Sequence, residues 1–96
     1  MCEISDNRFH ELKIARSYIK LLCLPDLAHG VKSVSLARIG NYEIRILEDT
    51  QTDSAERLLF WMELFDYGTQ ISIDSCRCHN IKEAVAAFED FISQSN

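Results

Sequence analysis

Apolar side chains are concentrated in two runs between residues 57 and 78, separated by a turn, in a pattern typical of two antiparallel strands. Residues 57–65 form the first run, a turn around Tyr67 and Gly68 interrupts it, and residues 71–78 form the second run. Successive side chains of a strand point to opposite faces, and large apolar residues occupy both faces of the first run. We therefore expect one face of this hairpin in the core and the other covered by a partner, because a solvated sheet face is normally polar.

The register of this hairpin decides which residues share a face. We expect Met62 and Leu64 to stand opposite Ile71 and Ile73, on the core side. The expected open face carries Leu59, Trp61, Glu63, Phe65, Ser72, Asp74 and Cys76. A face with a tryptophan and other large apolar side chains is a candidate interface.

A capped amphipathic helix is predicted to follow from residue 80. Asn80 is a preferred N-cap residue, and Glu83 three positions later completes a capping box. Apolar residues then recur at helical spacing along one stripe, which comprises Ile81, Ala84, Val85, Phe88, Phe91 and Ile92. We expect this stripe to pack on the sheet.

The N-terminal segment is a second predicted helix, with Ser5 or Asp6 as its cap and an end near Cys23, before Pro25. At 100° per residue its apolar side chains form two adjacent stripes. One stripe comprises Phe9, Leu12, Ala15, Ile19, Leu22 and Cys23, and the other comprises Ile14, Tyr18 and Leu21. Together they cover more than half of the circumference, so we expect this helix to be covered on two sides.

The middle of the chain predicts a further hairpin, in which Gly40 and Asn41 form a two-residue turn and Arg38 stands opposite Glu43. The expected fold class is therefore α+β, in the order α-β-β-β-β-α, with a four-stranded antiparallel meander and both helices packed on one face.

The chain is short enough to form a single small domain over residues 1–96. We expect residues 1–5 and 94–96 to be frayed, and the acidic residues 48–56 to form a mobile loop. The N-terminus lacks a signal-peptide pattern and no segment is apolar enough to span a membrane, so the expected location is cytoplasmic, with no membrane partner.

The charge is unevenly distributed along the chain. The formal net charge is −5; residues 1–40 carry six Lys or Arg against four acids, and residues 41–96 carry four against eleven. An acidic domain repels phosphate backbones, so we expect no nucleic-acid partner. The final helix begins Asn80, Ile81, Lys82, Glu83. The order helix, three strands, helix resembles the double-stranded RNA-binding domain, but that family has a lysine cluster at this helix start, and its function is not carried over.

Cys76, Arg77, Cys78 and His79 form the sharpest cluster of reactive side chains. Two thiolates and an imidazole are zinc ligands, which makes a metal site at Cys76, Cys78 and His79 an alternative, although no second ligand pair is evident. The two cysteines could also act in redox chemistry if Arg77 and the helix start lowered the pKa of Cys78. In the third interpretation, Cys76 and Cys78 have only a structural role, as small residues at the end of a strand.

These patterns favour a non-enzymatic, homo-oligomeric interaction or adaptor domain without a cofactor, with a homodimer as the default symmetry. The expected interface comprises Leu59, Trp61, Phe65, Ile14, Tyr18 and Leu21. The alternative function is a small-ligand or zinc-binding domain, which would use the Trp61 face or the corner from Cys76 to His79. No nucleophile and base can be placed together by sequence, so an enzyme has the least support.

Overall fold

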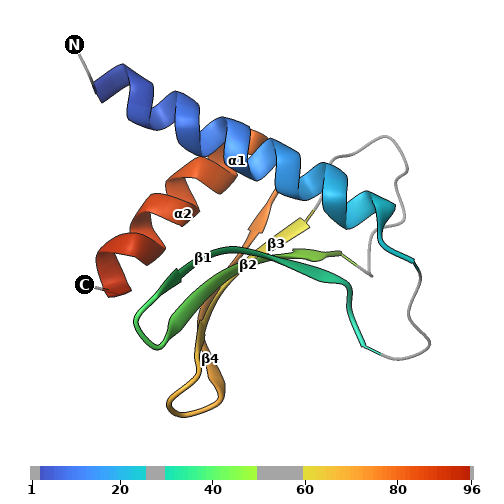
Figure 1. Cartoon of the computed structure of the whole chain (residues 1–96), viewed down its shortest axis with the longest axis vertical. Coiled ribbons are helices and arrows are strands. Elements are labelled where there is room, and N and C mark those ends of the chain that lie inside the picture. Colours follow the sequence, from blue (N-terminus) through green and yellow to red (C-terminus); the bar gives the residue numbers. More distant parts are fainter. Residues whose placement is uncertain (1–2, 26–29, 50–59, 96) are drawn as a thin grey trace.

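The computed structural model describes residues 3–25, 30–49 and 60–95, with the backbone alone described for residues 3–7. The elements in chain order are α1 (Glu3–Cys23), β1 (Ser33–Ile39), β2 (Tyr42–Glu48), β3 (Phe60–Asp66), β4 (Ile71–Cys78) and α2 (Ile81–Ser95). The strands form one antiparallel sheet in the order β1-β2-β3-β4 (Figure 1). The predicted α+β meander is confirmed.

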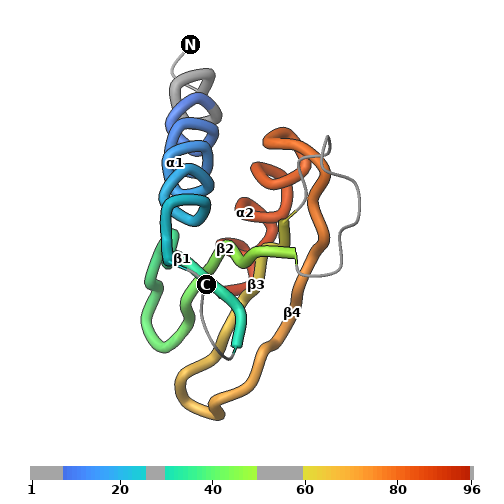
Figure 2. The backbone as a smooth tube through the Cα atoms, turned by 90° about the vertical axis from the view of Figure 1, so that its right-hand side faces the viewer, coloured from blue at the N-terminus to red at the C-terminus, as the bar shows by residue number. Residues whose placement is uncertain are grey.

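The two helices contact each other and pack on the same face of the sheet (Figure 1). α1 contacts β1 and β2, whereas α2 contacts β2, β3 and β4. The core between these layers comprises Ile14, Leu21, Leu36, Ile44, Ile46, Phe60, Met62, Leu64, Cys78, Ala84, Val85, Ala87, Phe88 and Phe91. The turn between β3 and β4 lies at the end of the molecule away from the helices (Figure 2).

α2 has the predicted cap and the predicted apolar stripe. The Asn80 side-chain oxygen accepts a hydrogen bond from the Glu83 backbone N–H at 2.8 Å. The Glu83 carboxylate accepts the backbone N–H of His79 at 2.8 Å, one residue earlier than in the usual capping box. Two backbone N–H groups around this helix start thereby have partners, which stabilises the point where the chain turns from β4 into α2.

The hairpin of β1 and β2 has the predicted turn and the predicted pair of Arg38 and Glu43. Gly40 has a φ of 60°, as a primed hairpin turn requires. A bulge between Ser35 and Ala37 shifts the register. Leu36 is therefore buried while Arg38, two residues on, is exposed, although simple alternation puts both on one face.

The predicted register of β3 with β4 is wrong. Leu64 stands opposite Asp74 rather than Ile71, and Met62 stands opposite Cys76. The turn spans residues 67–70, and the register shifts at Leu64 and Phe65, which leaves Ile73 as an extra residue in β4. An odd shift exchanges the two faces of a strand.

This shift moves Asp74 and Cys76 from the expected open face to the side of the helices. The Asp74 carboxylate accepts a hydrogen bond from Gln94 of α2 at 3.0 Å, and Cys76 packs against the core. Trp61, Glu63, Phe65 and Ser72 stay on the open face, as their alternation with Met62 and Leu64 and their strand pairing require.

The described elements begin and end at other residues than those expected from the sequence, whereas fraying of the ends stays a prediction. α1 begins at Glu3, so Ser5 and Asp6 lie within its first turn instead of before it, and α2 continues to Ser95. Glu48 belongs to β2, and Asp49 is buried. Residues 50–56 of the predicted loop lie outside the described residues.

Candidate functional site on the outer face of α1

The structure buries two of the expected interface residues and partly buries a third. Ile14 is 0% exposed and Leu21 is 2% exposed, so a partner cannot contact either of them. The Tyr18 ring packs against Phe60 of β3, with 5.2 Å between ring centroids. The stripe of Ile14, Tyr18 and Leu21 is therefore the core stripe of α1.

The other stripe of α1 is the exposed one. Phe9 is 64% exposed, Leu12 51%, Ile19 60% and Leu22 62%. They are half of the eight large apolar side chains that are exposed in the described part of the chain. Helical geometry places the centre of this stripe roughly 150° around the axis from the core stripe. α1 therefore has two apolar faces, and the fold buries one. We call the exposed stripe of Phe9, Leu12, Ile19 and Leu22 the outer face.

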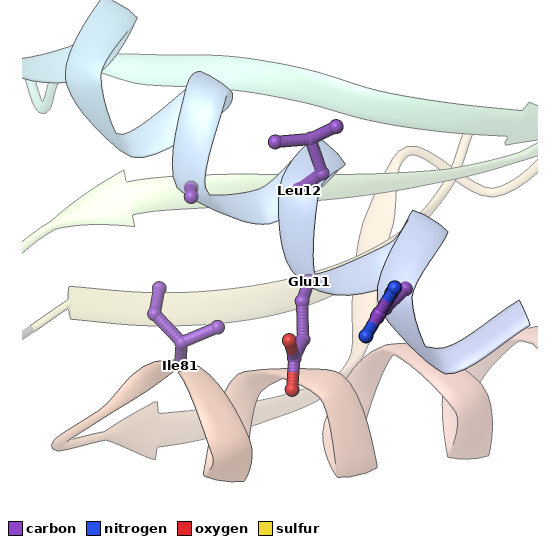
Figure 3. A pocket seen from close by; sticks show the side chains of 5 residues that line it. Glu11, Leu12 and Ile81 are labelled. Atoms are coloured by element: carbon purple, nitrogen blue, oxygen red, sulfur yellow. The ribbon is translucent and has the colours of Figure 1, made fainter. Parts of the chain in front are cut away.

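A groove of about 600 Å³ separates the outer face from the start of α2. It is lined by Arg8, Glu11, Leu12, Ala15 and Ile81. Figure 3 shows Glu11 pointing from α1 towards α2, with Ile81 on the opposite wall. The floor is mostly apolar, and one cation and one anion border it. We call it the α1–α2 groove.

His10, which lies between two groove-lining residues of α1, contacts two residues of α2. His10 Nδ1 lies 3.2 Å from a Glu89 carboxylate oxygen, and the His10 ring meets the edge of the Phe88 ring at 5.0 Å between centroids. These contacts join α1 to α2 beside the α1–α2 groove.

A second groove, of about 300 Å³, runs along the other flank of α1 beside β1. It is lined by Phe9, Leu12, Lys13, Arg16, Ser17, Lys20, Ser35 and Leu36. We call it the α1–β1 groove. Three of its residues are cations, and within the described part of the chain none of them forms an ion pair. Leu12 lines both grooves and therefore forms the ridge between them.

The open face of the sheet carries a network of arginine, glutamate and aromatic side chains. The Arg45 guanidinium lies over the Phe65 ring at 4.2 Å, and Arg38 lies over the Tyr67 ring at 4.1 Å. Glu43 accepts hydrogen bonds from Arg45 Nε and from the Tyr67 hydroxyl, each at 2.8 Å. This network covers Phe65 from within the chain, so the aromatic side chain does not need a partner to be shielded.

The ionisation of Glu43 follows from these contacts. Burial raises its pKa, but hydrogen bonds from Ser35, Arg45 and Tyr67, together with the charge of Arg45, outweigh burial and hold the pKa below its ordinary value of 4.5. The same Arg45 lies 3.5 Å from Glu63, whose buried Oε1 has no hydrogen-bond partner in the described part of the chain. One guanidinium thus holds two carboxylates.

Trp61 is half-buried and stands opposite Leu47 on one side and Arg77 on the other. Arg77 Nε donates a hydrogen bond to the Asp49 carboxylate at 2.8 Å. The Asp49 side chain is almost fully buried, and its ion pair with Arg77 lies next to Trp61. Leu59, the remaining expected interface residue, lies outside the described residues.

The corner from Cys76 to His79 holds a buried thiol with a raised pKa, that of Cys78. Cys78 is fully buried, and this burial, with the adjacent Cys76 and Glu83, raises its pKa to about 12. Arg77 points to the opposite face of β4, and the His79 ring lies 3.2 Å from Glu83. The expectation that Arg77 and the helix start acidify Cys78 is therefore wrong, since burial dominates.

No group of three or more His, Cys, Asp or Glu side chains in the described ranges comes together as a metal would need. The zinc alternative at Cys76, Cys78 and His79 thus finds no assembled ligand set there. Among the helices described, neither α1 nor α2 is long and apolar enough to cross a membrane.

The chain matches no family model, and comparison with curated proteins and with solved structures finds no match either. The outer face of α1 is therefore characterised by its own geometry. Its residues were visible in the sequence as one of two apolar stripes. The helical spacing of Lys13, Arg16 and Lys20 was visible in the sequence as well, but no sequence signal placed Ser35 and Leu36 beside them, because this wall arises only through the packing of β1 on α1.

Proposed function

We propose that the protein is a non-enzymatic interaction domain that binds a helix of a partner protein along the outer face of α1. The observation that carries the proposal is the exposure of Phe9, Leu12, Ile19 and Leu22 on a helix whose opposite stripe already fills the core. Recognition of one helix by apolar anchors at helical spacing is a common mode of protein binding.

The size of the outer face suits this partner. α1 has 21 residues, which corresponds to a length of about 30 Å at 1.5 Å per residue. A second helix lying along it would contact the ridge at Leu12 and the apolar walls of the α1–α2 groove. The side chains of two packed helices interdigitate in this way when the helix axes are about 8–10 Å apart.

The energetics indicate what the apolar contacts contribute. Full burial of a large aliphatic or aromatic side chain contributes about 1.5–3 kcal/mol, and the four side chains of the outer face are already partly covered. Covering them completely would therefore contribute roughly 3–6 kcal/mol, against an association cost of at least about 4 kcal/mol. The apolar stripe gives weak binding by itself, and polar contacts must supply the remainder.

A designed helical peptide of about 20 residues, with a leucine stripe and glutamine at its flanks, tests the proposal by isothermal titration calorimetry. We expect weak binding to the wild type, near millimolar, and no detectable binding to Ile19→Asp. Val31→Asp is a matched control, because Val31 is 43% exposed but lies outside α1 and β4. Equal affinity of the two variants, or no binding of any helical peptide, would contradict the proposal.

A second candidate function is self-association through β4. β4 lies at an edge of the described sheet, and Ile71 and Ile73 are exposed on it. The unpaired backbone groups of an edge strand are complementary to those of the same strand in a second copy, so two copies can join antiparallel about a two-fold axis. This supports the expected homodimer at a different surface from Trp61.

Sedimentation velocity at tens of micromolar tests the second candidate. We expect a dimer for the wild type and a monomer for Ile73→Lys, because a lysine on an edge strand disfavours edge pairing. Ile19→Lys should leave the dimer intact. A wild type that is folded by circular dichroism and sediments as a monomer would contradict self-association through β4.

A further inference from the structure

The α1–β1 groove concentrates positive charge on an acidic protein. Lys13, Arg16 and Lys20 line it within less than two helical turns, whereas the whole chain has a net charge of −5. Arg16 and Lys20 are exposed, and Lys13 is half-buried. No acidic side chain is among the residues that line this groove. The three cations have no partner within the described part of the chain, so their charges are available to a ligand.

We propose that the partner helix is an acidic amphipathic helix, with carboxylates along the edge that lies over the α1–β1 groove. This inference rests on the proposed function of the outer face and adds the chemistry of its partner. The three cations are spaced i, i+3 and i+7 on α1, which is about 4.5 and 10.5 Å along the axis. Glutamates at the same spacing on the partner helix would meet all three.

Leu12 and Phe9 connect the charged groove to the apolar stripe. Both residues line the α1–β1 groove and also belong to the outer face. A ligand that covers the outer face therefore reaches the cations without leaving the apolar surface. Charges at the rim of an apolar contact guide association and select the partner. The three cations can therefore supply the polar contacts that binding requires in addition to the outer face.

The charges argue against a second copy of α1 as the occupant. The described exposed residues of α1 on and beside the outer face include Arg8, Arg16 and Lys20, with Glu11 as the single acid among the groove-lining residues. Pairing this face with its own copy would bring cations to cations, and like charges at a contact are unfavourable. An acidic helix has no such conflict.

A broad polyanion is a poorer fit than an acidic helix. Nucleic acids and anionic membranes present negative charge over a large area, and residues 41–96 carry eleven acids against four Lys or Arg. Such a surface would meet repulsion from most of the molecule. A single helix can place its carboxylates on one groove, where the cations are gathered.

Two versions of the designed peptide test the inference, with identical leucine stripes and either glutamate or lysine in place of the glutamine flanks. We expect at least tenfold tighter binding of the glutamate peptide at 50 mM salt, and a smaller preference at 500 mM salt, because salt screens these contacts. Lys20→Glu should weaken binding of the glutamate peptide about fivefold. Lys82→Glu, which makes the same change on the exposed surface of α2, should change it less than twofold.

The outcomes separate this inference from the proposed function. Equal binding of the glutamate and lysine peptides, with both lost in Ile19→Asp, would overturn the acidic partner and leave the outer face as a docking surface. No binding of any of the three peptides would overturn both. Tighter binding of the wild type to phosphatidylserine vesicles than to the glutamate peptide, lost in Lys20→Glu, would replace the protein partner by a membrane surface. Circular dichroism of each variant confirms that it is folded.

Discussion

At the scale of single residues, Glu43 shows how one side chain connects the strands of the open face. Its carboxylate accepts hydrogen bonds from Arg45 of the same strand and from Tyr67 beyond β3, and its backbone pairs with Arg38 of β1. The cation on each aromatic ring and the shared carboxylate make one connected network. Removing one member should therefore weaken contacts on three strands.

The depressed pKa of Glu43 predicts a dependence of stability on acid. A carboxyl group whose pKa is lowered by folding stabilises the native state fully above its unfolded pKa, near 4.5, and loses that contribution as the pH falls through the lower folded pKa. Glu43→Gln should lower the free energy of unfolding by about 1–3 kcal/mol at pH 7, with the difference from wild type vanishing at low pH.

Urea denaturation between pH 2.5 and 7 measures this difference. Tyr67→Phe removes one hydroxyl donor but keeps the ring against Phe65, so it should show a smaller effect in the same pH window. A difference between wild type and Glu43→Gln that does not change with pH would contradict the role of the Glu43 charge.

The burial of Cys78 predicts its chemical behaviour. A thiol with a pKa near 12 is protonated at pH 8, and only the thiolate reacts with a maleimide. In the native protein Cys23, which is exposed, should be modified before Cys78, and Cys78 should react only when the protein opens. Peptide mapping by mass spectrometry distinguishes the two sites, and equal rates at Cys23 and Cys78 would be inconsistent with a buried, protonated thiol.

At the scale of elements, α1 has the most informative division of roles. Its core stripe, which includes Ile14, is buried between the sheet and α2. Its outer face is exposed, and Leu12 of this face forms the ridge between the two grooves. The two stripes are similar in composition, so the element by itself does not distinguish a core side from a docking side. The division predicts opposite consequences for neighbouring substitutions on one helix.

Ile14→Ala and Leu12→Ala form a matched pair. Ile14→Ala creates a cavity in the core and should lower the free energy of unfolding by about 2–5 kcal/mol. Leu12→Ala changes an exposed side chain and should stay within about 0.5 kcal/mol, while weakening binding of the helical peptide. Urea unfolding measures the first effect and calorimetry the second. Similar losses of stability in both variants would mean that Leu12 is not a surface residue.

At the scale of the whole molecule, the two candidate surfaces lie on different elements. The outer face belongs to α1, which packs on β1 and β2, whereas the exposed isoleucines lie on β4 at the other edge of the described sheet (Figure 1). Binding at the two surfaces should therefore be additive, because separate sites without shared contacts do not couple.

The additivity is measurable with one variant at each surface. Ile19→Asp should abolish peptide binding without changing the sedimentation coefficient, and Ile73→Lys should do the reverse. A change of peptide affinity in Ile73→Lys would show that the two surfaces are coupled. Each copy carries one outer face and one β4 edge. If the two surfaces act independently, two copies joined through β4 therefore form an adaptor that presents two outer faces.

The sequence by itself determined the elements of this protein. Strand alternation, the Asn80 cap with Glu83, Pro25 after the first helix and the glycine turn at Gly40 are local signals, and each acts within a few residues. The order of these elements and the short connections between them were then enough to predict the antiparallel meander and the placement of both helices on one face of the sheet. Such features need no knowledge of distant contacts.

Only the tertiary structure decided which faces these elements present. The bulges near Leu36 and Ile73 depend on the pairing of strands, and the second exchanged the faces of Asp74 and Cys76. The choice between the two stripes of α1 depends on how the helix packs against the sheet and α2. A period of 3.6 or 2 residues defines faces relative to one another, but packing chooses which face becomes the core, and therefore which one is left for a partner.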